Sequence, residues 1–133
     1  MDTTSLAQTA RSQIERARAS AHGRSAHTVH GGHDHVLRQT VIALRAGETL
    51  QEHDSSREAT LQVLAGRVRL AAATRAVEAV AGDLLAVPAD AHTLHAIADS
   101  AVLLTVGLVL GTPAPVAVAG NAGPGYSWQE DWN

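Results

Sequence analysis

Histidine offers the most chemistry in this sequence, because the chain has eight histidines and no cysteine. Five of the histidines lie within fourteen residues: His22, His27, His30, His33 and His35. If this segment is extended, His33 and His35 share one face and Asp34 lies on the other, so His33 and His35 form a candidate pair of metal ligands. Gly31 and Gly32 indicate a loop instead, and surface histidines without a ligand are the alternative interpretation.

Other reactive arrangements are missing from the sequence. Without cysteine there is no disulfide framework, no thiolate metal site and no cysteine nucleophile. The sequence also lacks a nucleophile elbow, a glycine-rich phosphate loop and an H-E-x-x-H helix. Ser55 stands two residues from His53, but no orienting carboxylate or oxyanion donor accompanies the two residues. A serine hydrolase is therefore not predicted.

Charge and hydropathy argue against nucleic-acid and membrane partners. The net charge is -3 and all ten basic residues are arginines, so no large positive field is expected. The longest apolar run, 101–110, is interrupted by Thr105 and Gly107 and is much shorter than the roughly 20 residues of a membrane span. The first residues lack the apolar core of a signal peptide. We expect a cytoplasmic protein.

A helix is predicted near the start of the chain, where apolar residues recur every three or four positions. The stripe comprises Leu6, Ala10, Ile14, Ala17 and Ala21. Ser5 and Gln8 match a capping-box start, and Gly23 is a plausible stop. Because the stripe is only weakly apolar, this helix needs a larger surface to pack on. Residues 1–24 are interpreted as helix and linker.

The middle of the chain has the pattern of an all-β domain, over residues 25–111. Short β-rich runs alternate with turn residues at intervals of about 8 to 12 positions, which is typical of sandwiches and barrels. The predicted strands are 26–30, 36–44, 49–53, 59–64, 67–72, 76–80, 84–87, 92–97 and 101–110. Residues 112–133 carry all three aromatics and no periodicity, and are predicted to be a flexible tail.

Two glycine-anchored blocks resemble the paired motifs of the cupin superfamily. The anchors are Gly47, His53 and Gly66 in the first block, and Gly82, Pro88 and His92 in the second. The similarity covers 36–110, and segments 53–66 and 88–104 look like small bacterial cupins. The resemblance implies a cupin-type double-stranded β-helix, a jelly-roll barrel, to which the residue pattern adds one N-terminal helix and a flexible C-terminal tail.

The resemblance also implies a site in which this sequence keeps two of four ligands. In cupins, two histidines, a glutamate and a last histidine hold a divalent metal, usually iron, manganese, nickel or zinc. Here His53 and His92 match, whereas Ser55 and Ala59 replace the second histidine and the glutamate. Two imidazoles are fewer than the three protein ligands typical of catalytic metals. The expectation is a weakly held metal, or two pocket histidines that hydrogen-bond an organic ligand or one another.

Strand alternation selects the neighbours of these histidines. Glu58 lies one residue before the glutamate position at Ala59, and His95 lies three residues after His92. Because side chains alternate between the two faces of a strand, we expect both to face away from the barrel interior. The expected ligand-binding residues are His53, Ser55, His92, Val41, Leu61 and Val63.

Three functions remain open at this point. The chain could be a non-catalytic cupin that binds a small molecule, a metal-dependent cupin enzyme of the oxygenase or isomerase type, or a dimeric sensor or interaction module. A homodimer is expected in each case, because the edge strand 26–30 is free to pair and symmetric closure is the commonest solution.

Overall fold

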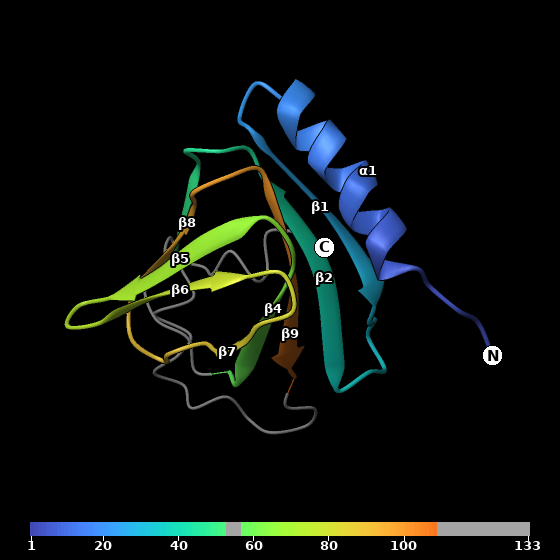
Figure 1. Cartoon of the computed structure of the whole chain (residues 1–133). Coiled ribbons are helices and arrows are strands. Elements are labelled where there is room, and N and C mark those ends of the chain that lie inside the picture. Colours follow the sequence, from blue (N-terminus) through green and yellow to red (C-terminus); the bar gives the residue numbers. More distant parts are fainter. Residues whose placement is uncertain (53–56, 109–133) are drawn as a thin grey trace.

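The structure, a computed structural model, describes residues 1–52 and 57–108 of the 133-residue chain. These residues form one helix and nine strands in two antiparallel sheets (Figure 1). The elements are α1 (Leu6–Ala19), β1 (Arg24–His30), β2 (Leu37–Leu44), β3 (Thr49–Glu52), β4 (Ala59–Ala65), β5 (Arg67–Ala72), β6 (Ala76–Val80), β7 (Leu84–Ala86), β8 (His92–Ala96) and β9 (Ser100–Gly107). The predicted helix start and strand order are confirmed.

The two sheets pack face to face as a jelly roll. One sheet has the order β1-β2-β9-β4-β7 and the other has the order β3-β8-β5-β6. Aliphatic side chains from the inner faces of both sheets form the main core, including Ile42, Leu61, Val68 and Leu94. Inner and outer residues alternate along half-exposed strands such as β5, as the sequence predicts. The all-β fold class is confirmed.

Helix α1 covers the outer face of the five-stranded sheet and lies alongside β1 and β2 (Figure 1). Its N-terminus is capped by Ser5, whose Oγ accepts a hydrogen bond from the Gln8 N–H at 3.2 Å. Ala10 and Ala17 are fully buried against the sheet. Strands β2 and β9 are therefore buried on both faces, which explains their continuous apolar sequences.

The expected inward orientation of Val41 is wrong. Val41 is fully buried, but it packs in the second core beneath α1, together with Ala43, Ala101 and Leu103. Ile42 and its partner Val102 face the sandwich interior instead. Because every residue from 41 to 44 is apolar and buried, alternation alone does not show which set faces inward.

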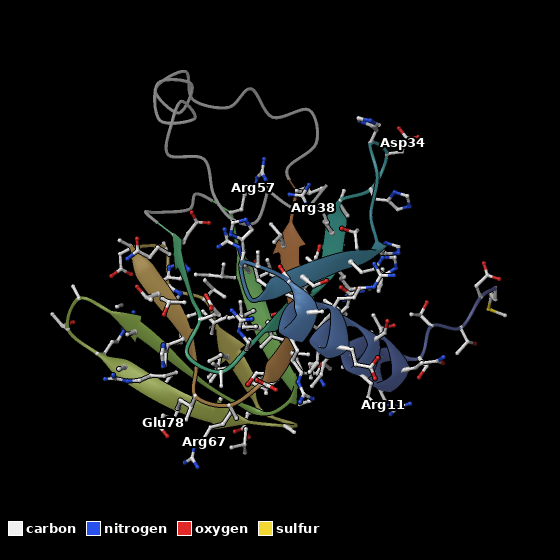
Figure 2. The ribbon with its side chains drawn as sticks, turned by 90° about the horizontal axis from the view of Figure 1, so that it is seen from above. Arg11, Asp34, Arg38, Arg57, Arg67 and Glu78 are labelled. Carbon is white, nitrogen blue, oxygen red and sulfur yellow. The ribbon has the colours of Figure 1, made fainter. Side chains whose placement is uncertain are left out.

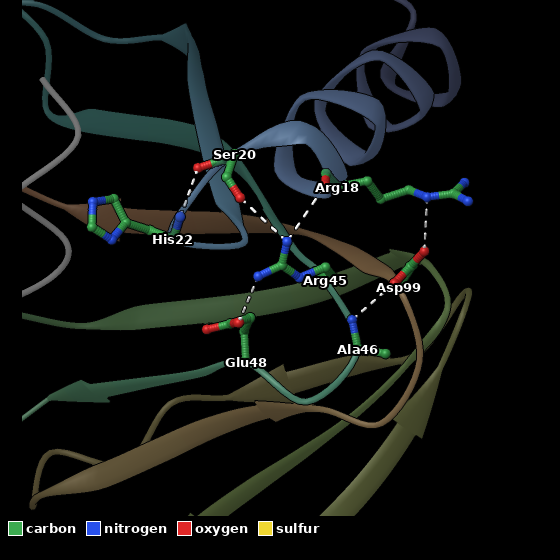
Figure 3. A network of polar contacts seen from close by, with 7 residues as sticks. All are labelled: Arg18, Ser20, His22, Arg45, Ala46, Glu48 and Asp99. Carbon is green, nitrogen blue, oxygen red and sulfur yellow. Dashed lines mark hydrogen bonds and ion pairs between the residues drawn. The ribbon is translucent and has the colours of Figure 1, made fainter.

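The end of the sandwich where α1 stops, which we call the helix end, is held by a polar network (Figure 3). The Arg45 guanidinium donates to the carbonyl oxygens of Arg18 at 3.4 Å and Ser20 at 3.2 Å, and to Glu48 Oε2 at 3.2 Å. Asp99 accepts from the Ala46 N–H at 2.8 Å and pairs with Arg18 Nε at 3.3 Å. These contacts attach the last turn of α1 to loops of both sheets.

Gly66 and Ser100 complete the helix end. The buried Ser100 Oγ accepts from the Arg67 N–H at 2.9 Å and lies 2.7 Å from the Ala98 carbonyl oxygen. Gly66 has a φ of +86°, and a Cβ there would lie 2.3 Å from Ser100 Oγ. Both the backbone conformation and the close approach of Ser100 require glycine.

Some predictions concern residues outside the described ranges. His53 and Ser55 are among them, and so is the tail 112–133 with its three aromatics. The flexible tail and the boundaries 1–24, 25–111 and 112–133 therefore stay predictions. Within the described part of the chain, no helix is long and apolar enough to cross a membrane.

Candidate functional site

The candidate site lies at the opposite end of the sandwich, which we call the histidine end. Here β1 and β3 end, and β2, β4 and β8 begin. Figure 2 shows Arg38 and Arg57 on the opposite side of the molecule from Arg67 and Glu78, which belong to β5 and β6. Ionisable side chains enter the interior at this end, whereas the rest of the main core is aliphatic.

Glu52 and His92 form a buried cross-strand pair. They are direct partners in the β3–β8 ladder, so their Cβ atoms are about 4.5–5.5 Å apart on one face of the sheet. The exposed fraction is 2% for Glu52 and 3% for His92, and both carboxylate oxygens of Glu52 are shielded from solvent. Glutamate is almost never buried to this extent without a specific partner. A carboxyl group and an imidazole therefore lie side by side in the interior, shielded from solvent.

The tautomer of His92 follows from one hydrogen bond. Its Nδ1 lies 2.8 Å from the carbonyl oxygen of Asp90. Because a carbonyl can only accept, Nδ1 carries the proton and donates it. In the neutral ring Nε2 is then the basic nitrogen, the one that accepts a hydrogen bond or ligates a metal. The loop before β8 thus orients the ring, and its Nε2 is shielded from solvent.

Arg38 enters the interior from the facing sheet. It pairs with Val106, which belongs to the main core, and the β2–β9 register is regular over the whole of β2. Arg38 therefore shares the inward face, and its Nε and Nη2 atoms are shielded from solvent. Val106 also pairs with Ala59 on its other side, so Arg38 and Ala59 lie in one row, about 10 Å apart.

The remaining predicted residues lie at different distances from the candidate site. Leu61 and Val63 are fully buried in the main core, on the same face of β4 as Ala59. Val63 lies four residues from Ala59, about 13 Å along the strand and close to the helix end. Leu61 is thus the nearer of the two to the candidate site.

Glu58 and His95 face away from the interior, as alternation predicts. Glu58 is exposed, and its carbonyl oxygen accepts from the Gly107 N–H. His95 lies on the outer face of its sheet, where Nδ1 is 3.0 Å from Thr49 Oγ1. Neither side chain is positioned to join Glu52 and His92.

Glu52 is the site residue that the sequence reasoning missed. The spacing from Gly47 favoured His53 as the site residue, and the prediction did not use Leu50, the one strongly apolar residue of the strand. Leu50 must face the core, and Glu52, two positions later, shares its face. That phase was readable from the sequence as Thr-Leu-Gln-Glu.

The predicted pairing of His33 with His35 stays a prediction, because the one ring contact that the structure gives for His35 has another partner. His35 contacts His30, with ring centres 4.9 Å apart in an edge-to-face arrangement. Among residues 1–52 and 57–108, no group of three or more histidines, aspartates or glutamates is placed to hold a metal.

Solved structures of known proteins resemble this fold over about two thirds of the chain. A cupin superfamily protein from Desulfitobacterium hafniense aligns with a TM-score of 0.59 and 15% identity, covering 65% of this chain and 78% of that one. The chain has a cupin fold. KdgF from Halomonas sp. aligns with a TM-score of 0.56 and 16% identity, covering 65% of this chain and 81% of that one.

A third similar structure is a conserved protein of unknown function from Streptococcus pyogenes. It has a TM-score of 0.58 and 22% identity, with coverage of 68% of this chain and 78% of that one. No family model and no curated protein matches the sequence. At these identities the likenesses show the cupin fold alone.

The donor set at the histidine end fits a weakly held metal. One imidazole nitrogen and one carboxylate suit zinc, iron, manganese or nickel by ligand type. They are one protein ligand fewer than catalytic zinc sites use, and Ala59 brings only a methyl group to the place where the cupin motif has glutamate. The described residues therefore match part of a metal centre.

Proposed function

We propose that this chain is a small-ligand-binding cupin whose ligand contacts His92 and Glu52 at the histidine end. The adjacent burial of an imidazole and a carboxylate carries this proposal. Binding sites are mostly apolar surfaces with a few converging polar groups, and the aliphatic interior around this pair supplies that contrast. His53, the next residue after Glu52 in the chain, is proposed as a further contact. No reaction is assigned.

The ligand chemistry follows from the charges that meet there. Glu52 accepts hydrogen bonds, His92 Nε2 accepts or ligates, and the guanidinium of Arg38 donates from the facing sheet. A small polar molecule with both donor and acceptor groups suits this combination better than an apolar one. Leu61 would provide apolar contact beneath it.

A divalent transition metal is the second candidate, favoured by the nitrogen and oxygen donors of His92 and Glu52. Such an ion would supply Lewis acidity when bound. His92 would offer Nε2, held in orientation by the Asp90 carbonyl, and Glu52 would offer a carboxylate. With two ligands from the described residues, we expect weak affinity and ready loss to a chelator.

The test is a thermal-shift screen of small polar metabolites and of zinc, manganese, nickel and ferrous ions. A ligand at one hundred times its Kd adds about 2.7 kcal/mol to the free energy of unfolding. His92→Gln and Glu52→Gln should lose at least tenfold in affinity for any hit. His95→Gln is the matched control, because His95 is on the same strand but on its outer face.

The outcomes separate the alternatives. Equal binding by the wild type and by both site variants would overturn the proposal. A stoichiometric metal that survives extended dialysis against EDTA would favour a metal-dependent enzyme over a binding protein. Binding of an organic molecule without any metal would support the first candidate.

We also propose that the chain forms a homodimer in the cytoplasm. Strand β1 is the outer strand of its sheet, and the outer strands β6 and β7 expose Val77, Val80 and Leu84. Edge strands and exposed apolar side chains of this kind are commonly covered by a second subunit. Light scattering at micromolar concentration should return twice the chain mass, and a strict monomer would contradict the dimer.

A further inference from the structure

The turn between β1 and β2 brings together two exposed histidines that are five residues apart in the sequence. His30 is the last residue of β1, and His35 follows the Gly31-Gly32 pair. Their ring centres are 4.9 Å apart with an interplanar angle of 76°. His30 and His35 are not among the residues of the candidate site, although the turn lies at the same end of the sandwich and Gly31 closely approaches Arg38.

A β-bulge in β1 sets the direction of His30. Thr28 lies opposite Thr40, but His30 lies opposite Gln39, so an extra residue is accommodated between them. Gln39 is one residue out of phase with the inward-facing positions of β2, so the bulge moves His30 to the outer face. Without this shift, alternation would turn His30 toward the interior, away from a solvent-borne ligand.

The turn itself sets the position of His35. The His35 N–H donates to the Gly32 carbonyl oxygen at 3.2 Å, which closes the turn. A Cβ on Gly32 would lie 3.3 Å from His35 Nδ1, so the missing side chain leaves room for the ring. Figure 2 shows Asp34 at the tip of this turn, projecting away from the sandwich.

The separation of the two rings matches that of two imidazoles on one metal ion. Metal–nitrogen bonds of about 2.0–2.1 Å place each ring centre about 3.2 Å from the ion. At ligand angles between about 90° and 110°, the two centres are then about 4.5–5.2 Å apart. The observed 4.9 Å lies within this range. Because both side chains are exposed, they can turn their nitrogens toward a common ion without disturbing the core.

We propose that His30 and His35 bind a divalent transition metal such as zinc, nickel or copper, which imidazole ligands favour. Water completes the coordination, because no third histidine or carboxylate of the described residues joins the pair. The site differs from the pair that spacing alone suggests, which is His33 with His35. That difference makes the proposal directly testable.

The experiment is a zinc titration of the full chain, followed by NMR of the imidazole Cε1–H groups. Single substitutions assign the signals of the eight histidines. The signals of His30 and His35 should move together along one binding curve. His30→Ala and His35→Ala should each weaken zinc binding at this site at least tenfold. The double variant should bind no more weakly than either single variant, because the two ligands act as a unit.

Three controls are available in the same chain. His33→Ala and His27→Ala should leave the curve unchanged, since both side chains are exposed and outside the pair. His92→Gln should also leave it unchanged, which keeps this result independent of the candidate site. The proposal is overturned if His33→Ala weakens binding as much as His35→Ala, if His30→Ala has no effect, or if neither signal moves at about 1 mM zinc.

Discussion

The two ends of the sandwich use charged residues in opposite ways. At the helix end, Arg45 and Asp99 lie at the surface and satisfy backbone carbonyl and N–H groups of loops and of α1. At the histidine end, Glu52 and His92 are withdrawn from solvent into an aliphatic interior. The first arrangement contributes stability, whereas the second imposes a desolvation cost. Such a contrast is expected where one end maintains the fold and the other binds a ligand.

Gly66→Ala should have the largest effect on stability, because Gly66 makes the closest contact at the helix end. The new Cβ would lie 2.4 Å from the Asp99 carbonyl oxygen, and the φ of +86° is strained for alanine. We expect a loss of about 3 kcal/mol or more in the free energy of unfolding, and a fall in Tm of roughly 10 °C or more.

Gly47→Ala is the matched control for this variant. Its φ is +93°, but no atom lies within 4 Å of the position that a Cβ would take. Only the backbone cost of about 1–2 kcal/mol then applies. Thermal unfolding followed by circular dichroism measures both variants, and equal losses would show that packing against Ser100 is unimportant.

Arg45→Met should have an intermediate effect. The variant keeps most of the side-chain volume but removes the donors that bind the last carbonyls of α1. Since the side chain is 38% exposed, solvent replaces part of the lost interaction, and we expect a loss of about 1 kcal/mol. Chemical denaturation should show this loss, with the exposed Arg11→Met unchanged as a control. A loss of equal size in Arg11→Met would remove the special role of Arg45.

Glu52→Gln and His92→Gln should have smaller effects on stability despite their burial. Both substitutions approximately preserve side-chain size and keep hydrogen-bonding atoms in place, so the existing partners of Glu52 and His92 can still be satisfied, and Glu52→Gln also lowers the cost of keeping a carboxylate away from water. Without ligand we expect changes of less than about 1 kcal/mol in the free energy of unfolding. A loss of several kcal/mol would show that the histidine end, like the helix end, is built for stability.

Deletion of 112–133 should have the smallest effect. Because the sequence predicts a tail without periodic structure, Tm should stay nearly unchanged. Both tryptophans, Trp128 and Trp132, lie in this segment, so intrinsic fluorescence reports on it alone. Emission near that of free tryptophan is expected, and a clear blue shift would contradict the prediction.

The fold was predictable because its signals are local. Turn glycines and alternating strands placed every strand to within a few residues, and Ser5 marked the helix start. The direction in which β2 faces was not predictable, since α1 buries the outer side of Val41 as completely as the core buries Ile42. That information depends on tertiary packing between segments far apart in the chain.

The site was only partly predictable. His92 was found through the cupin resemblance, and it is buried where the interior receives polar groups. Glu52 was overlooked because a motif spacing was given more weight than the phase set by Leu50. The partner of His35 depends on a bulge between Thr28 and His30, and a bulge leaves no clear trace in a sequence without turn residues at that point.

The docking of α1 also constrains how the chain folds during synthesis. Ala10 and Ala17 pack against Ala101 and Leu103 of β9, about ninety residues later in the sequence. The helix can therefore meet β1 and β2 soon after synthesis, but the part of its docking surface that β9 supplies is made much later, and contacts of such high sequence separation form slowly. Until β9 pairs with β2, the apolar surface beneath α1 is incomplete and stays partly exposed to chaperones and to other nascent chains.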